Sequence, residues 1–190
     1  ETVSEFSDVS VSCGVHPLHQ EDACDYDTLL QKASRPEVVA IGETGLDYFY
    51  SADTKAVQLQ SFVDHIRVAN ALSKPLIIHT RDAREDTLSL LREHKAPETI
   101  GVLHCFTESL AMAQDAIDMG FYISISGIVT FNSADELREV LQTFSDTGEG
   151  LPGTEVMEPP RSPPPPCPAE RWSASPGRKS STCISTRTTA

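Results

Sequence analysis

The chain has 190 residues, 39% of them hydrophobic, which is enough for one domain with a core. A complete eight-stranded α/β barrel normally needs about 250 residues. The formal net charge of −13 argues against general affinity for nucleic acid, because phosphate contacts need Lys and Arg, although bound divalent cations reverse this locally. No apolar run approaches about 18 residues, so we expect no membrane span.

The two parts of the sequence differ in composition. Residues 1–150 contain 25 acidic and 10 basic residues, whereas the remaining 40 contain 3 and 5, together with nine of the thirteen prolines. We therefore expect a folded domain over 1–150 and a Pro/Ser-rich tail over 151–190. The tail has too little apolar surface to offset its chain entropy, so we predict that it is disordered.

Strand-like and helix-like segments alternate along residues 9–144. The predicted strands are 9–15, 38–41, 76–78, 100–103 and 121–129. The predicted helices are 26–34, 54–72, 82–94, 108–119 and 133–144. Five strand–helix units joined by short loops are typical of an α/β fold.

Three of these units place a metal-capable side chain at or just past the end of an apolar run. The side chains are Glu43, His79 and His104, separated by 36 and 25 residues. The carboxyl ends of the strands form the active face of a (β/α) barrel, so all three should point into one mouth. A Glu with two imidazoles and an open position is a catalytic zinc set, in which the ion lowers the pKa of its water to about 7 or polarises a phosphoryl oxygen.

Each residue taken singly has a simpler interpretation, as a core histidine or a loop carboxylate. Their occurrence at corresponding ends of three units favours a metal site. The histidines at 19, 65 and 94 lie in helical or loop contexts and are expected to be surface residues.

Five motifs in order then give the sequence a family likeness. They are Cys13-Gly-Val-His-Pro17, Gly42-Glu-Thr-Gly-Leu-Asp-Tyr48, Pro75-Leu-Ile-Ile-His-Thr-Arg81, His104-Cys-Phe106 and Gly120-Phe-Tyr-Ile-Ser-Ile-Ser-Gly-Ile-Val129. Over about residues 9 to 144 the chain resembles the TatD family of metal-dependent deoxyribonucleases. The resemblance implies a TIM (β/α)8 barrel, here partial with about five to six βα units, that cleaves DNA phosphodiesters with two divalent ions.

By that resemblance, Glu43 would be the catalytic carboxylate that bridges the ions, and His79 and His104 would complete the ligands of one ion. The metal would be Mg, Zn or Mn, and DNA would be the substrate. Arg81 is a candidate phosphate contact, with a surface arginine at a helix start as the alternative. No stable protein partner is indicated.

The chain also departs from the family pattern. It begins after the His-x-His pair of the family's first strand, and Pro160 stands where a ligand Asp is expected after Glu158. We therefore expect a chain truncated at both ends, with at most one tightly bound ion and impaired activity. In comparison with the family, the tail over 151–190 looks like the product of a shifted reading frame that replaces the last two strands. The alternatives are a non-catalytic fragment or pseudogene product, and an amidohydrolase acting on a small ester or amide.

The five cysteines are odd in number and form no CxxC pair. Reduced thiols are the simplest account of this pattern, so we expect a cytoplasmic or nuclear protein.

Overall fold

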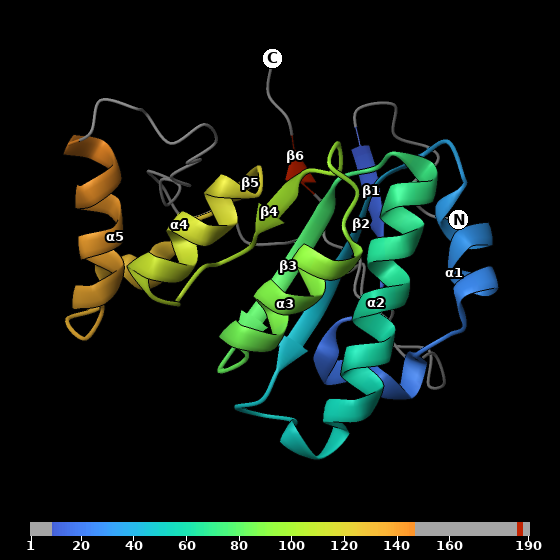
Figure 1. Ribbon diagram of the computed structural model, residues 1–190, viewed down its shortest axis with the longest axis horizontal. Coiled ribbons are helices and arrows are strands. Elements are labelled where there is room, and N and C mark those ends of the chain that lie inside the picture. Colours follow the sequence, from blue (N-terminus) through green and yellow to red (C-terminus); the bar gives the residue numbers. More distant parts are fainter. Residues whose placement is uncertain (1–8, 147–185, 188–190) are drawn as a thin grey trace, which may run out of the picture.

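The computed structural model describes residues 9–146 and 186–187, and its centre is one twisted sheet with the strand order β5-β4-β3-β2-β1-β6 (Figure 1). Strands β1 to β5 pair in parallel, and β6 pairs antiparallel with β1. The strands are β1 (Val9–Cys13), β2 (Val38–Asp47), β3 (Leu76–Arg81), β4 (Gly101–Leu103), β5 (Phe121–Ile123) and β6 (Thr186–Arg187).

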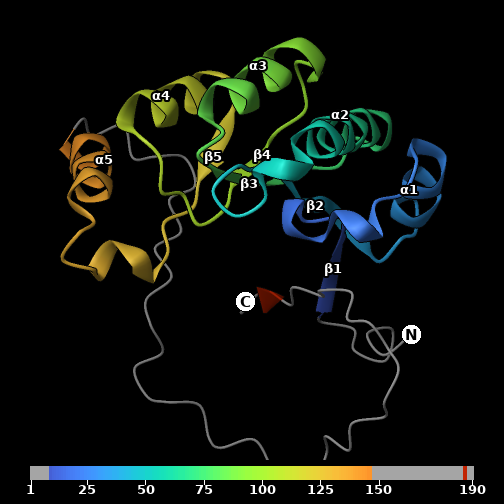
Figure 2. The ribbon, with the colours of Figure 1, turned by 90° about the horizontal axis from the view of Figure 1, so that it is seen from below.

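A helix follows each of the five parallel strands. The α-helices are α1 (Tyr26–Ala33), α2 (Lys55–Leu72), α3 (Arg84–His94), α4 (Leu110–Asp118) and α5 (Asp135–Asp146). Three short 3-10 helices are η1 (Pro17–Asp22), η2 (Ala52–Thr54) and η3 (Gly127–Thr130). Seen from below, α1 to α4 lie along one face of the curved sheet, in the manner of the outer ring of a barrel (Figure 2).

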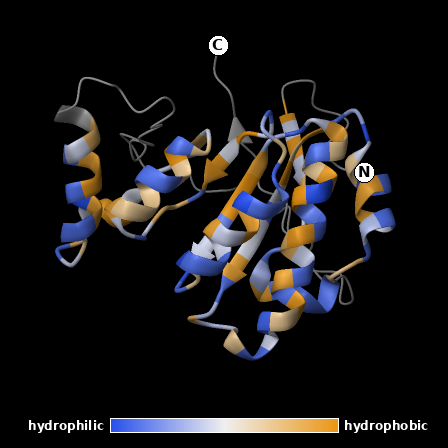
Figure 3. Ribbon diagram, viewed as in Figure 1, coloured by the Kyte–Doolittle hydropathy of each residue, from blue (hydrophilic) through white to orange (hydrophobic). Residues whose placement is uncertain are grey.

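The core lies between the sheet and this helical layer. Helix α2 contributes Phe62 and Ile66, and the strands contribute Ile41, Leu76 and Ile78, all fully buried. Figure 3 shows hydrophobic strands at the centre and helices that alternate between hydrophobic and hydrophilic residues. Burial of such apolar surface is the main favourable contribution to the stability of the domain.

The α/β fold with successive βα units is therefore confirmed, with two differences in detail. Strand β2 continues to Asp47, so Glu43 lies within a strand and not at the start of a loop. The strand expected over 121–129 ends at Ile123, and Gly127–Thr130 forms η3. After Ile123 the Ser124 N–H donates to the Leu103 carbonyl and the Ser124 carbonyl accepts from the Phe106 N–H, so this residue still contacts the end of β4 and the segment that follows it.

The helical spacing of apolar residues over 54–72 predicts that Val57 faces inward, but its side chain is 48% exposed. The next residue, Gln58, is fully buried and bonds to Asp47 at the end of β2. In the first turn of α2 the polar side chain of Gln58 therefore faces the sheet, and Val57 does not.

Apart from Thr186–Arg187, the tail over 151–190 lies outside the described residues, as do Glu158 and Pro160. The predictions for that segment stay predictions. Within the described part of the chain, no helix is both long and apolar enough to cross a bilayer.

Candidate metal centre

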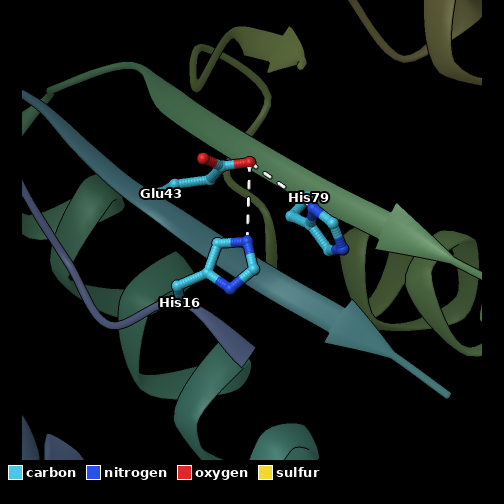
Figure 4. Close-up of side chains that lie close together, drawn as sticks. All are labelled: His16, Glu43 and His79. Atoms are coloured by element: carbon cyan, nitrogen blue, oxygen red, sulfur yellow. Dashed lines mark ion pairs between the residues drawn. The ribbon is translucent and has the colours of Figure 1, made fainter. Parts of the chain in front are cut away.

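One carboxylate oxygen of Glu43 is the meeting point of three imidazole rings. Glu43 Oε1 lies 3.3 Å from Nδ1 of His104, 3.5 Å from Nδ1 of His79 and 3.9 Å from Nε2 of His16. The carboxylate side chain is only 12% exposed. Figure 4 shows two imidazoles turned toward this oxygen, His16 from the segment after β1 and His79 from β3.

The three residues predicted as ligands therefore approach one point. Glu43 comes from β2, His79 from the adjacent β3, and His104 from the first position after β4. Among the described residues, however, the compact donor group is His16, Glu43 and His79, whose ligand atoms all lie within 4.8 Å of one another. His104 contacts the same Glu43 oxygen from outside that group.

His16 is a site residue that the sequence reasoning missed. It follows β1 as His104 follows β4, so its position after a strand was the signal that could have found it. Its Nδ1 accepts a hydrogen bond from the Leu18 N–H at 3.1 Å, so a neutral ring carries its proton on Nε2, the atom that faces Glu43. In this tautomer Nε2 offers no lone pair to an ion, and at 3.9 Å it is too far from Glu43 Oε1 for a hydrogen bond.

His79 has the opposite arrangement. Its Nε2 lies 2.9 Å from Oδ2 of Asp47, a carboxylate that is only 1% exposed. In the neutral ring, donation of the Nε2 proton to Asp47 leaves the Nδ1 lone pair directed toward Glu43. In the protonated ring, Nδ1–H donates to Glu43 instead. A histidine held in this way by a carboxylate is the usual arrangement of a metal ligand.

Asp47 is itself held by a buried side chain of α2. Gln58 Oε1 accepts from the Asp47 N–H at 2.8 Å, and Gln58 Nε2 donates to the Asp47 carbonyl at 3.1 Å. The same amide nitrogen donates to the Ser51 carbonyl and to Thr54 Oγ1, so Gln58 joins the end of β2 to η2. The site is therefore fixed from the helical layer.

Glycine permits the close approach of the two strands that carry the site. Gly45 pairs with His79 across β2 and β3 and has a φ of 132°, a conformation that side chains rarely adopt. A Cβ at this position would lie 2.0 Å from the His79 carbonyl oxygen. The glycine thus sets the spacing between Glu43 and His79.

The ionisation of the group follows from these contacts. Burial alone would raise the pKa of Glu43, but hydrogen bonds with His104 and His79 outweigh it and lower the pKa to about 2. For His79, burial is outweighed by hydrogen bonds with Glu43 and Asp47, so its pKa is raised. The hydrogen bond with Glu43 raises the pKa of His104, whereas burial and the nearby His79 lower that of His16.

Arg81, the predicted phosphate contact, ends β3 beside the site. Its guanidinium lies over the rings of Phe49 and Tyr50, 4.3 Å and 4.9 Å from their centroids. The structure records no ion pair of Arg81 with any described residue.

His65, expected at the surface, is buried with 2% of its area exposed. Its Nδ1 lies 2.6 Å from the Ser61 carbonyl of its own helix, and its Nε2 accepts from the Val15 N–H at 3.0 Å. The prediction was wrong because His65 satisfies a backbone donor of the segment just before His16. Of the other two histidines, His19 is exposed and His94 is half-buried.

A carboxylate and several imidazoles gather where the parallel strands of this α/β sheet end. This arrangement defines a class of proteins, the barrels that carry a metal centre at the ends of their strands. The donors fit such an ion, since Glu43 Oε1 and His79 Nδ1 face each other with lone pairs available and Asp47 fixes the imidazole.

Comparison with known proteins identifies the family within this class. The profile described as TatD related DNase matches residues 1–147, and the chain belongs to this family. The uncharacterised metal-dependent hydrolase YcfH of Escherichia coli K12 is 53% identical over 139 residues, which cover 73% of this chain and 52% of YcfH.

Two further similar proteins are also named as TatD or as a TatD homologue. The 3'-5' ssDNA/RNA exonuclease TatD of Shigella flexneri is 37% identical over 140 residues, 72% of this chain and 54% of that protein. The crystal structure of YJJV, a TatD homologue of Escherichia coli K12, superposes with a TM-score of 0.66 at 28% identity, over 74% of this chain and 56% of YJJV. The chain thus spans about half the length of the curated relatives it matches.

Proposed function

We propose that this chain carries half of the active site of a metal-dependent phosphodiesterase that cleaves nucleic acid. The observation that carries the proposal is the convergence of His79 and His104 on one buried Glu43 oxygen, with Asp47 behind His79. The name of the Shigella flexneri relative supports nucleic acid as the substrate.

Each residue has a defined task in this proposal. Glu43, His79 and His104 would hold a divalent ion of Mg, Zn or Mn, and Glu43 is the proposed catalytic carboxylate. The bound ion would supply positive charge at a phosphoryl oxygen and a more acidic water. Asp47 keeps a proton on Nε2 of His79, and His16 lies beside Glu43 with its Nε2 3.9 Å from the carboxylate. Glu43 stays ionised at neutral pH because its pKa is about 2.

A cytoplasmic or nuclear location is also proposed. Its support is that the three described cysteines, Cys13, Cys24 and Cys105, are free.

The test of the function combines metal binding with hydrolysis. The purified chain would be titrated with Zn²⁺, Mn²⁺ and Mg²⁺, and cleavage of single-stranded and double-stranded DNA would be followed with each ion. We expect slow cleavage, because the described residues hold one compact donor group whereas two-ion chemistry needs ligands for a second ion. Loss of about 4 kcal/mol of transition-state stabilisation slows a reaction roughly a thousandfold.

The decisive variant is Glu43→Gln, with Glu85→Gln on the exposed face of α3 as the matched control. Glu43→Gln should abolish both ion binding and cleavage, while the control keeps both. If the chain binds an ion through Glu43 and cleaves no DNA with any metal, it is a non-catalytic fragment and the proposed activity is wrong.

A further inference from the structure

Two neighbouring aromatic side chains are unusually exposed where β2 ends. Phe49 is 55% exposed and Tyr50 is 62% exposed. Their rings meet edge to face, with centroids 4.6 Å apart and an interplanar angle of 85°. Adjacent aromatic rings that bury so little area contribute little to the core, which points to a ligand rather than to the fold.

The third member of the group is a cation without a carboxylate partner. Arg81 covers part of both rings, and within residues 9–146 and 186–187 it forms no recorded ion pair. This is unusual in a chain of net charge −13, where other arginines pair with acids, such as Arg84 with Glu108 at 3.1 Å. Its charge therefore remains available to an anion that lies against the rings.

The same carboxylate joins this group to the candidate metal centre. Asp47 Oδ1 accepts from the Tyr50 N–H at 2.8 Å, while Asp47 Oδ2 contacts His79 Nε2 at 2.9 Å. The Tyr48 N–H also donates to the Arg81 carbonyl at 2.9 Å. Asp47 thus connects the two aromatic rings and Arg81 to His79, one of the donors that would hold the ion.

The loop that carries the rings is held firmly. Gln58 bonds to the backbone on both sides of the rings, at Asp47 and at Ser51. The hydroxyl of Tyr48 donates to Asp86 on α3 at 2.6 Å. A ligand would therefore meet rings that are already in place, with little loss of conformational entropy on binding.

We propose that Phe49, Tyr50 and Arg81 form a subsite that stacks a nucleobase of single-stranded nucleic acid, next to the phosphodiester at the Glu43–His79 centre. The proposal rests on the proposed function and adds how the substrate is held. Flat aromatic and guanidinium surfaces suit a base of any sequence, and the guanidinium charge suits the adjoining phosphate. Bases of a duplex are already stacked and paired, so the subsite selects single strands or frayed ends.

The overall charge increases the importance of local contacts to nucleic acid. Residues 1–150 hold 25 acidic and 10 basic side chains, so general attraction to the phosphate backbone is absent. Local contacts beside the metal centre then gain weight, and stacking on Phe49 and Tyr50 is one that the described surface offers. Binding should consequently depend weakly on salt.

The test compares the binding of an oligonucleotide that has bases with the binding of one that lacks them. Binding of fluorescein-labelled oligothymidylate and of the same oligomer with abasic residues is measured by anisotropy, without added divalent ion. We expect the wild-type chain to prefer the oligomer with bases. Phe49→Ala and Tyr50→Ala should each weaken its binding by about five- to a hundredfold and leave binding of the abasic oligomer unchanged. Tyr50→Phe should retain the affinity.

Two variants serve as matched controls. Phe131→Ala removes a ring that is 60% exposed on the connection from η3 to α5. Arg67→Ala removes an arginine that also lies over a tyrosine, Tyr26, at 4.7 Å, but from α2. Neither should change the preference for bases, whereas Arg81→Ala should reduce it.

The outcomes separate this inference from the proposed function. Equal binding of both oligomers by the wild-type chain, or equal losses for both in the Phe49 and Tyr50 variants, overturns the stacking subsite. In that case loss of cleavage in Glu43→Gln would still support the hydrolase. Conversely, base-dependent binding that Phe49→Ala removes, in a chain that cleaves nothing, supports the subsite and rejects the hydrolase.

Discussion

The carboxylate of Asp47 lies 2.9 Å from Nε2 of His79, buried beneath the ring. This contact fixes which nitrogen of His79 carries the proton and therefore which nitrogen can face an ion. Its other oxygen holds the Tyr50 backbone. One buried side chain thus orders the candidate ligand and the exposed ring beside it.

Replacement of this carboxylate should weaken the metal centre without removing a ligand. Asp47→Asn retains the size of the side chain, but its amide is a weaker partner for the His79 N–H, so we expect divalent-ion affinity to fall by about 10- to 100-fold. Isothermal titration with Zn²⁺ measures the change. Asp64→Asn on α2 is the control and should bind like wild type. Equal affinities for all three proteins would show that Asp47 does not orient His79.

A second prediction concerns the number of ions. One compact donor group is found within the described residues, so elemental analysis after dialysis should give no more than one tightly bound ion per chain. His79→Ala should remove most of it, because the Nδ1 donor is lost. His94→Ala, at the end of α3, is the control and should keep full occupancy. Two ions per wild-type chain would reveal further ligands.

A third prediction compares two glycines with positive φ. Gly45→Ala should destabilise the domain by about 2–6 kcal/mol, because it adds backbone strain and an overlap with the His79 carbonyl. Gly120→Ala, after α4, has nothing within 4 Å of the added Cβ and should cost only about 1–2 kcal/mol of conformational strain. Urea denaturation of both variants measures the difference, and similar losses would mean that the β2–β3 contact is not tight.

The fourth prediction concerns pH. Burial lowers the pKa of His65 from 6.5 to about 4. Between these values the unfolded chain binds more protons than the folded one, so this residue's contribution to stability is lost as the pH falls from 6.5 toward 4. The loss should reach about 3 kcal/mol.

The measurement compares unfolding free energies of wild type and His65→Leu at pH 7 and pH 4.5. The variant should be less stable at pH 7, since the Val15 N–H loses its acceptor. The difference in unfolding free energy between wild type and variant should be smaller at pH 4.5. Gln60→Leu, exposed on the same helix, should show a constant gap. A constant gap for His65→Leu as well would mean that His65 titrates alike in both states.

The local pattern of the sequence determined the order of strands and helices and the three residues that approach one carboxylate oxygen. Apolar runs bounded by proline or glycine are readable without the fold, and parallel strands bring their following residues to one edge. The sequence alone therefore predicted that Glu43, His79 and His104 lie together.

Only the tertiary structure decided the roles of His16, Asp47 and His65. Their functions depend on partners far away in sequence: His65 accepts from Val15, 50 residues earlier, and Asp47 contacts His79, 32 residues later. Helical spacing could not show that His65 is buried, because its polar ring is satisfied by a backbone donor of another element. Which imidazole nitrogen faces Glu43 is likewise set by the hydrogen bond at the opposite nitrogen, and that bond exists only once the strands have paired.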